Sequence, residues 1–552
     1  MKTKHLLFIV LLAFMQVSPV NLQSQDWVAR YTGTFQNSID LSYWVTIDED
    51  GNSYVTGRSD YKYATIKYNS SGVQQWEART NSGESWANCI DINTDNYGKV
   101  YVTGYTTYNS YKQITTYAYS TSDGGANWST SYNSAYGDCI GWMVKYDPLS
   151  NDIYVVGERT GNGTGLDYVV LRFDGSTGDL SDSWPDNGFG DGVRVYNGTG
   201  NGDDKALSIA ISAGDVYVTG VSYNDRGGYD NTTVAYEGDG DLKWVARSAG
   251  GDITINERKN LIAADYSRGV YVTNSSGGYV VVLKYDPGDG SLQWAHGGSY
   301  SGVGRSIGFF SRTIGNTWAH TNDVFVTGLF NGHLGVIKYF DNGDLDWERE
   351  YDGNGQGYFL GIDDAENVYA CGYLQSTYLN MVLVSYSSGG DLNGAYTYNG
   401  PGNADDKAVS LAVDPSGVSY ITGLSYGSST NLDYATIKNQ PLNDGGDHFM
   451  IQNLNGTENP ESLIPDSYSL QQNYPNPFNP VTTINYALPH NGIIYLKVYD
   501  VLGREVAMLV NQKLTPGTYE VEWDGSYYPS GVYFYRMQAD GFSQSRKMVL
   551  LK

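Results

Sequence analysis

A short motif, an aromatic residue followed by Val-Thr-Gly or a close variant, recurs eight times and constrains the fold more than any other feature. The copies follow one another at intervals of roughly 44 to 63 residues, the size of one four-stranded propeller blade. Such a period predicts that copies of one small unit are stacked together. The copies begin at Tyr54, Tyr101, Tyr154, Tyr217, Tyr271, Phe325, Tyr369 and Tyr420.

Each copy lies within a longer pattern that predicts four strands. An apolar run and an Asp/Gly turn precede it, as in residues 45–52, and a β-rich run ending in Lys-Tyr follows, as in residues 63–68. A glycine-containing turn then leads to a strand bearing a tryptophan. With 68 Gly, 50 Tyr and 12 Trp in 552 residues, and only 17% charged residues, the composition also disfavours helices. We therefore predict an all-β protein.

The two ends of the repeat array predict its closure. The array opens with a tryptophan strand at residues 26–31 that belongs to no preceding unit, and the last unit stops near Lys438 without its own tryptophan strand. Pairing these ends would give a closed β-propeller of eight four-stranded blades and would leave no edge unpaired. Seven blades is the alternative if the irregular fifth or sixth unit is not a blade.

The repeat tryptophans are predicted to pack between neighbouring blades, because they recur at one position of the pattern. They are Trp27, Trp76, Trp128, Trp184, Trp244, Trp294 and Trp347. The last strand of this kind, near Tyr396, has no tryptophan.

Two units share the longer pattern Tyr-Asn-Gly-x-Gly-Asn-x-Asp-Asp-Lys-Ala, at residues 196–206 and 398–408. With the Val-Tyr-Val-Thr-Gly strands, these units resemble the bacterial β-propeller repeats called SBBP repeats, over about residues 26–440. The resemblance implies a propeller at residues 25–440 and an extracytoplasmic setting, and it implies no defined activity.

The N-terminus predicts export. Lys2 and Lys4 precede a short apolar run at residues 6–14, so residues 1–24 are expected to be a signal peptide that directs the chain to the periplasm. The nearest cysteine, Cys89, is far from the cleavage region, which argues against lipid attachment. No later run has the length of a membrane-spanning helix.

The C-terminal part has a different pattern. Residues 441–470 have the composition of a linker, and residues 471–552 contain six or seven short strand-like runs that predict a small immunoglobulin-like β-sandwich. This segment closely resembles the type A sorting domain of type IX secretion cargo. The matching residues are Tyr474, Pro475, Asn476, Pro477, Phe478, Asn479, Pro480, Tyr499, Gly503, Arg504, Gly517, Tyr519, Gly531 and Tyr533.

The sorting-domain resemblance implies recognition by the type IX secretion machinery, followed by release or attachment to the outer surface. A sandwich without a sorting role is the alternative. The formal net charge of -26 makes nucleic acid an unexpected partner, since it would repel phosphates.

No catalytic motif is found. The five histidines outside the signal peptide stand in no known catalytic pattern, and the pairs Asp203-Asp204 and Asp405-Asp406 recur at one loop position, as turn residues do. No cofactor is predicted, and calcium at Asp48–Asn52 is the alternative to a β-turn there. The three cysteines are read as buried apolar residues, a bridge between Cys89 and Cys139 being the alternative.

Two classes of function follow. The first is a monomeric binding or adhesion protein whose carbohydrate or protein ligand, not identified by the sequence, contacts the loops of one face or the central channel. The alternative is a glycan-active or other hydrolytic propeller. Acidic or histidine side chains converging at the channel mouth would favour the enzyme, and an aromatic platform without them would favour the binding protein.

Overall fold

The computed structural model describes residues 26–33, 39–80, 84–92, 98–250, 261–313, 320–428, 431–442, 468–470, 473, 476–488, 492–501, 503–514, 517–526, 528–539 and 542–552. The chain divides into two compact units, residues 1–450 and 451–552, which we call the repeat unit and the C-terminal unit. Every regular element in the described ranges is a β-strand, which confirms the all-β prediction. The predicted signal peptide, most of the linker, Tyr474 and Pro475 lie outside the described residues.

The repeat unit consists of antiparallel sheets that follow the chain order. Four sheets have four consecutive strands each. The first holds β2 (Leu41–Ile47), β3 (Ser53–Ser59), β4 (Lys62–Tyr68) and β5 (Gln74–Arg79), and the second holds β6 (Ser85–Ile92), β7 (Lys99–Tyr108), β8 (Tyr111–Ser120) and β9 (Ala126–Tyr132). The third holds β10 (Cys139–Asp147), β11 (Asp152–Thr160), β12 (Leu166–Asp174) and β13 (Val193–Tyr196), and the fourth holds β14 (Lys205–Ser212), β15 (Asp215–Tyr223), β16 (Tyr229–Tyr236) and β17 (Leu242–Ala249).

The next ten strands form one continuous sheet, because two long strands each pair on both sides. The strands are β18 (Ile262–Asp265), β19 (Gly269–Ser276), β20 (Tyr279–Tyr285), β21 (Leu292–Thr313), β22 (His320–Phe330), β23 (His333–Tyr339), β24 (Leu345–Ile362), β25 (Val368–Gln375), β26 (Leu379–Tyr386) and β27 (Leu392–Tyr398). The first part of β21 pairs with β20 and its second part with β22, and β24 divides in the same way between β23 and β25. The ten strands therefore make three successive four-stranded ladders, which we count as the fifth to seventh sheets.

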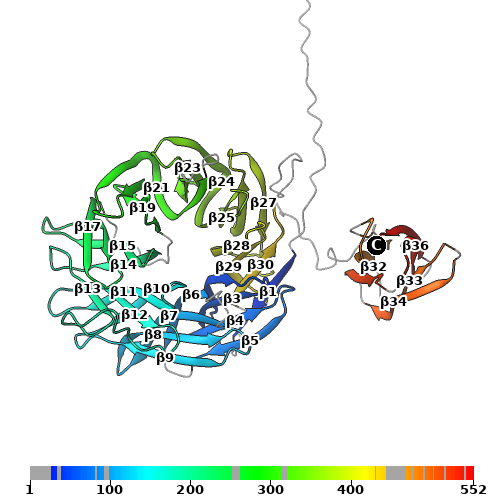
Figure 1. Cartoon of the computed structure of the whole chain (residues 1–552), viewed down its shortest axis with the longest axis horizontal. Helices are drawn as coiled ribbons and strands as arrows, with labels where there is room; N and C mark the ends of the chain where they lie inside the picture. The colour runs from blue at the N-terminus through cyan, green and yellow to red at the C-terminus, as the bar shows by residue number, and fades with distance from the viewer. Residues whose placement is uncertain are drawn as a thin grey trace, which may run out of the picture. The chain divides into compact units, whose positions relative to one another are not determined.

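The last sheet joins the two ends of the repeat array. It has the order β1-β30-β29-β28, with β28 (Lys407–Val413), β29 (Ser419–Tyr426), β30 (Leu432–Asn439) and β1 (Trp27–Tyr31). Its β29 also contacts the first sheet, since Ser42 Oγ donates to the carbonyl of Gly423 at 2.6 Å. In Figure 1 the sheets of the repeat unit lie side by side around a common centre, with β6, β10, β14 and β28 near it and β5, β9, β13 and β17 at the outer edge.

The recurring motif forms the second strand of each sheet. Tyr54 and Val55 are fully buried, as are the equivalent residues of most other copies. The motif's glycine is required by a bulge in the first strand, because a Cβ on Gly57 would lie 2.0 Å from the carbonyl oxygen of Leu41. The fifth copy has Asn274 instead, and its buried side chain contacts Asn231 of the fourth sheet.

One expectation differs from the structure, and one alternative is excluded by it. Trp184 was expected on a strand, but it lies in the connection between β12 and β13, because residues 175–192 form a longer connection there than in the other sheets. Cys89 and Cys139 are not bridged: Cys89, Cys139 and Cys371 are all free and buried, as small apolar residues are. In the described ranges, no helix has the length and apolar character to cross a membrane.

The C-terminal unit contains two antiparallel sheets. One has the order β31-β32-β35, with β31 (Ser469–Leu470), β32 (Val481–Leu488) and β35 (Gly517–Asp524), and the other has the order β34-β33-β36-β37, with β34 (Glu505–Leu514), β33 (Gly492–Tyr499), β36 (Gly531–Ala539) and β37 (Phe542–Leu550). Ile484 and Trp523 of the first sheet pack in one buried cluster with Leu496 and Tyr535 of the second. This shared core holds the two sheets together.

Candidate functional site

The repeat tryptophans form the junctions between sheets. Each donates its Nε1–H to a backbone carbonyl in a turn of the next sheet: Trp27 to Ser70 (3.0 Å), Trp76 to Thr121 (3.0 Å), Trp128 to Gly175 (3.2 Å), Trp184 to Gly238 (3.2 Å), Trp244 to Pro287 (3.1 Å), Trp294 to Asp341 (2.9 Å) and Trp347 to Ser388 (2.9 Å). A turn glycine lies under the ring. At Gly290, whose φ is +72°, a Cβ would lie 2.6 Å from Cδ2 of Trp244.

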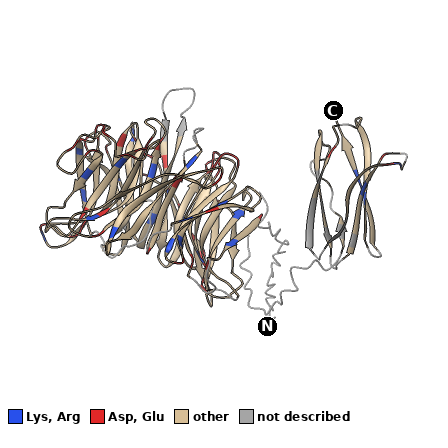
Figure 2. Ribbon diagram, turned by 90° about the horizontal axis from the view of Figure 1, so that it is seen from below, with Lys and Arg blue, Asp and Glu red and all other residues tan. Residues whose placement is uncertain are grey.

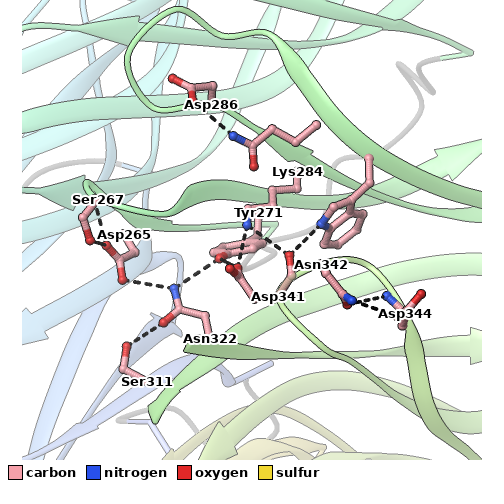
Figure 3. Close-up of polar contacts among 12 residues, drawn as sticks. Asp265, Ser267, Tyr271, Lys284, Asp286, Ser311, Asn322, Asp341, Asn342 and Asp344 are labelled. Atoms are coloured by element: carbon pink, nitrogen blue, oxygen red, sulfur yellow. Dashed lines mark hydrogen bonds and ion pairs between the residues drawn. The ribbon is translucent and has the colours of Figure 1, made fainter. Parts of the chain in front are cut away.

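The Lys-Tyr strands contribute to the same junctions, as Figure 3 shows for the turn that follows β23. Lys284 and Trp294 both donate to the carbonyl of Asp341, at 3.0 and 2.9 Å, and the hydroxyl of Tyr271 donates to Oδ1 of Asp341 at 2.5 Å. Lys284 also forms an ion pair with this carboxylate at 2.6 Å. These recurring positions of the pattern therefore hold one sheet to the next.

One junction has no tryptophan, and the chain ends explain why. The last sheet takes its fourth strand, β1, from the N-terminal end of the unit, so no turn connects β30 to β1. A tryptophan on β27 would have no turn carbonyl to bind. Leu442 fills this place, and its Cδ2 would lie 3.1 Å from a Cβ on Gly394 of β27.

The turns between first and second strands are rich in aspartate, and Figure 2 draws the acidic residues in red. Asp48 accepts the backbone N–H groups of Asp50 and Asn52 on Oδ1, at 3.1 and 2.8 Å, and the hydroxyl of Tyr54 on Oδ2 at 2.8 Å. This is the hydrogen bonding of an Asx turn. Among the described residues, no three His, Cys, Asp or Glu side chains gather as metal ligands would. We call the side of the repeat unit that carries the turns between first and second strands the Asp-turn face.

The paired aspartates also bind backbone groups. Asp204 accepts the N–H groups of Gly198 and Tyr223 at 2.6 and 2.8 Å, and Asp203 accepts that of Leu166 at 3.0 Å. Asp405 and Asp406 repeat this arrangement in the last sheet, where Asp406 accepts the N–H of Gly400 at 2.7 Å. Both pairs organise turns.

The opposite side carries the turns between second and third strands and the connections between sheets, and we call it the hairpin face. Exposed tyrosines gather there. Tyr61 is 60% exposed, Tyr108 63% and Tyr111 60%, and the others on this face are Tyr136, Tyr279 and Tyr378. Among the exposed tyrosines in the described part of the repeat unit, Tyr266 alone lies on the Asp-turn face. The hairpin face therefore offers aromatic rings to a ligand.

Glu158, at the hairpin end of β11, is a buried acid that the sequence did not single out. Burial raises the pKa of its carboxyl, while the charges of Lys205 and Lys112 and a hydrogen bond from Nε1 of Trp142, at 3.2 Å, oppose the shift. Asp203 raises it further. No signal marked Glu158, because its position in the repeat holds different residue types, such as Arg58 and Tyr105, in other sheets.

The described histidines do not come together. The ring of His296 stacks on Tyr339 at 4.7 Å, between the fifth and sixth sheets, and Nδ1 of His333 lies 3.0 Å from the carbonyl oxygen of Gly353. His320 begins β22, and His448 and His490 lie outside the described residues.

In the C-terminal unit, the proline-rich motif is fixed against the last strand. The Asn476 side chain accepts the N–H of Val549 at 2.9 Å, and Phe478 exchanges backbone hydrogen bonds with Val549 and Leu551. The Phe478 ring is buried, and its centroid lies 5.5 Å from that of the Trp523 ring. The peptide bonds preceding Pro477 and Pro480 are cis, and the carbonyl of Pro480, which follows Asn479, accepts the N–H of Gly525.

The other predicted motif residues lie in turns and strands of the same unit. Asp500 accepts the N–H of Arg504 at 3.0 Å and binds its Nε at 2.7 Å around Gly503, whose φ is +77°, directly after Tyr499. The Tyr533 hydroxyl donates to the carbonyl of Pro529 at 2.8 Å. Gly531 begins β36, and Gly517 and Tyr519 lie in β35.

Comparison with known families identifies this unit. Residues 472–551 match the model of the secretion system C-terminal sorting domain. The match confirms a type IX secretion sorting domain and indicates a protein that is exported and then secreted or displayed on the cell surface. No curated protein matches the chain.

Solved structures give weaker likenesses. Sqt1 of Chaetomium thermophilum, bound to the N-terminus of ribosomal protein L10, has a TM-score of 0.45 and 9% identity over 76% of this chain and 100% of that chain. PorZ of Porphyromonas gingivalis, a surface component of the type IX secretion system, has a TM-score of 0.24 and 14% identity over 93% of this chain and 81% of that chain. At these TM-scores, neither likeness supports an argument about fold or function.

Proposed function

We propose that this chain is an exported binding protein: a closed, eight-bladed propeller of SBBP-like repeats that is carried out by its sorting domain and binds an extracellular ligand on its hairpin face. Residues 1–24 would direct it to the periplasm, and residues 441–470 would link the propeller to an immunoglobulin-like sorting sandwich. The released or surface-attached protein would act as a monomer without a cofactor.

Strand pairing and sheet junctions support the closed ring. Five separate four-stranded sheets and three ladders of the ten-stranded sheet account for eight blades. Across the seam between the chain ends, β1 pairs with β30, and Trp27 of this strand donates to Ser70 of the first sheet. A ring of this kind has no unpaired edge strand to aggregate.

The observation that carries the binding proposal is the gathering of exposed tyrosines on the hairpin face. Tyrosine side chains supply large contact areas at a small cost in conformational entropy, and their hydroxyl groups add hydrogen bonds. The tryptophans of the repeat, by contrast, have their Nε1–H groups and rings engaged between sheets.

A hydrolytic enzyme is the second candidate, and Glu158 is the residue that favours it. A buried carboxyl with a raised pKa has the property of a general acid. Asp203, whose charge raises the pKa of Glu158, accepts the N–H of Leu166. A glycosidase would need a second carboxylate acting opposite the first.

Panels of immobilised glycans and proteins, probed with the mature chain, test this proposal. A ligand bound at the hairpin face should lose most of its affinity in the double variant Tyr108→Ser and Tyr111→Ser. The matched control is Tyr266→Ser, which removes an exposed tyrosine from the Asp-turn face and should leave binding unchanged. The opposite result would contradict the proposal, and hydrolysis that disappears in Glu158→Gln would favour the enzyme.

A further inference from the structure

Among the described cations of the hairpin face that lie over aromatic rings are Arg58, Lys112 and Lys407. The Arg58 guanidinium carbon lies 4.2 Å from the ring centroid of Tyr61 and 4.7 Å from that of Trp86. Lys112 Nζ lies 4.6 Å from the centroid of Tyr105. In the last sheet, Lys407 Nζ lies 5.5 Å from the Tyr373 centroid. These cations belong to three sheets in succession around the ring: the last, the first and the second.

In the described part of the chain, the charges of these three cations have no acidic partner. Among the residues that the structure describes, no carboxylate oxygen lies within 4.0 Å of Arg58, Lys112 or Lys407. The absence is notable in a protein with 60 acidic and 34 basic residues. Lys112 is close enough to Glu158 to affect its pKa, but Glu158 is buried beside Trp142.

Cations near the Asp-turn face behave differently. Lys284 pairs with Asp341 at 2.6 Å, Arg172 with Asp152 at 2.6 Å, and Lys243 with Asp215 at 2.6 Å. Lys338 has three carboxylates within reach, the nearest at 2.9 Å. Some cations of the hairpin face are paired as well, since Arg79 pairs with Asp60 at 2.7 Å and Arg226 with Asp230 at 3.2 Å. The three stacked cations differ from both groups in having no carboxylate within 4.0 Å among the described residues.

The acids of the hairpin face do not offset these cations. Asp138 accepts the backbone N–H of Lys112 at 2.8 Å, and Asp203 and Asp405 accept backbone N–H groups in the same way. Because these carboxylates organise the backbone, the stacked cations retain N–H donors for an anion from outside. Guanidinium and ammonium groups bind carboxylates through charge-assisted hydrogen bonds.

We propose that Arg58, Lys112 and Lys407, with their stacked rings, bind an anionic polysaccharide built from uronic acids. This inference rests on the proposed function and names the ligand class of its hairpin face. The carboxylates of the sugars would pair with the cations, and the C–H faces of the pyranose rings would lie on exposed tyrosines such as Tyr61, since aromatic faces are electron-rich. A polymer with one carboxylate per sugar can meet successive sheets at once, which raises its avidity.

Polygalacturonate is the probe, with dextran as the neutral polymer and poly-L-glutamate as the acidic peptide, each titrated into the mature chain by calorimetry. Wild type should bind polygalacturonate, more weakly as salt rises, and should not bind dextran. The double variant Arg58→Gln and Lys112→Gln should weaken binding about tenfold or more. The control Lys145→Gln and Arg268→Gln removes the same charge from the Asp-turn face and should change binding less than about twofold.

Two further outcomes decide the ligand class. Tyr61→Ser should weaken polygalacturonate binding, because it removes a ring that the sugar contacts, while thermal unfolding stays unchanged. Equal binding of poly-L-glutamate, insensitive to Tyr61→Ser, would overturn the carbohydrate inference. A ligand whose binding depends on Tyr108 and Tyr111 but not on Arg58 and Lys112 would overturn this inference and leave the proposed function standing. Binding that is lost only in the Asp-turn control would overturn both.

Discussion

Single residues stabilise the junctions between neighbouring sheets, and a substitution of Trp244 tests this role most directly. Its side chain is 7% exposed, donates to Pro287 at 3.1 Å and covers Gly290 of the next turn. Trp244→Ala should lower the free energy of unfolding by about 3 to 5 kcal/mol, as large core truncations do. Leu242→Ala, at a 57% exposed position of the same strand, should cost less than about 1 kcal/mol in the same denaturant titration.

A second residue-scale prediction concerns Glu158 and pH. Burial raises the pKa of this carboxyl in the folded protein, so its charged form is disfavoured there. The resulting loss in the free energy of unfolding is absent below the ordinary glutamate pKa of about 4.3 and grows as pH rises through the folded-state pKa. Glu158→Gln, which keeps an acceptor for Trp142, should therefore unfold like wild type at low pH and be more stable at neutral pH.

Denaturant titrations at both pH values check this prediction. Glu348→Gln, an exposed position on β24, is the control and should change stability by the same amount at both pH values. A neutral-pH stability of wild type above that of Glu158→Gln would show that Lys205 and Lys112 outweigh burial.

The repeat allowed the junction tryptophans to be identified in advance, but not their partners. Trp244 bonds to a carbonyl 43 residues away, in a turn whose approach depends on how sheets pack. Trp184 is the clearest case that the repeat pattern did not predict. It lies in a long connection and not on a strand, yet it binds the same kind of turn as the strand tryptophans do. The stacked cations were not predicted either, since Arg58 and its ring Trp86 belong to different sheets.

At the scale of elements, β1 is predicted to be essential for a soluble repeat unit. It pairs along its whole length with β30, and Arg30 forms an ion pair with Asp433 at 2.7 Å. Deleting residues 25–32 should leave an unpaired edge on β30 and remove the Trp27 junction, so the protein should aggregate. Size-exclusion chromatography and thermal unfolding measure the effect.

The control for this deletion is Val28→Ser, which changes an exposed side chain of β1 without removing the strand. It should leave the protein monomeric. A peptide of residues 26–32 added to the deleted protein should reduce aggregation by pairing with the open edge. A deleted protein that stays monomeric with an unchanged melting temperature would refute the role of β1.

The strand pattern predicted most elements, because alternating apolar residues and Gly/Asp turns are local signals. It did not predict that β21 and β24 each run from one ladder into the next. Between β13 and β14, residues 197–204 form a connection rich in turns, in which Asp204 accepts the N–H groups of Gly198 and Tyr223. The corresponding stretches of β21 and β24 remain extended, although β24 contains Asp352 there.

At the scale of the whole molecule, composition marked two units and a change of pattern near residue 440. The C-terminal motif was recognisable because its turns depend on specific residues, such as Asp500 with Gly503 and Asn476 beside the last strand. The ligand could not be recognised in this way. Its candidate surface is assembled from hairpins of several sheets, and each contributes one or two residues with no common motif.

The last prediction concerns export. Because residues 472–551 match the sorting domain and form a compact unit with its own buried core, their removal should leave a folded repeat unit that stays in the periplasm. Fusing residues 440–552 to a periplasmic reporter, in a host with the type IX machinery, should carry the reporter to the cell surface or the medium. The matched control is the same fusion with Phe478→Ala and Trp523→Ala, which removes two packed rings from the core and should abolish export. Fractionation and surface proteolysis measure the outcome. If the full chain and the truncated chain leave the cell equally, or if the intact fusion remains in the periplasm, these residues are not sufficient for sorting and the export signal must lie elsewhere in the chain.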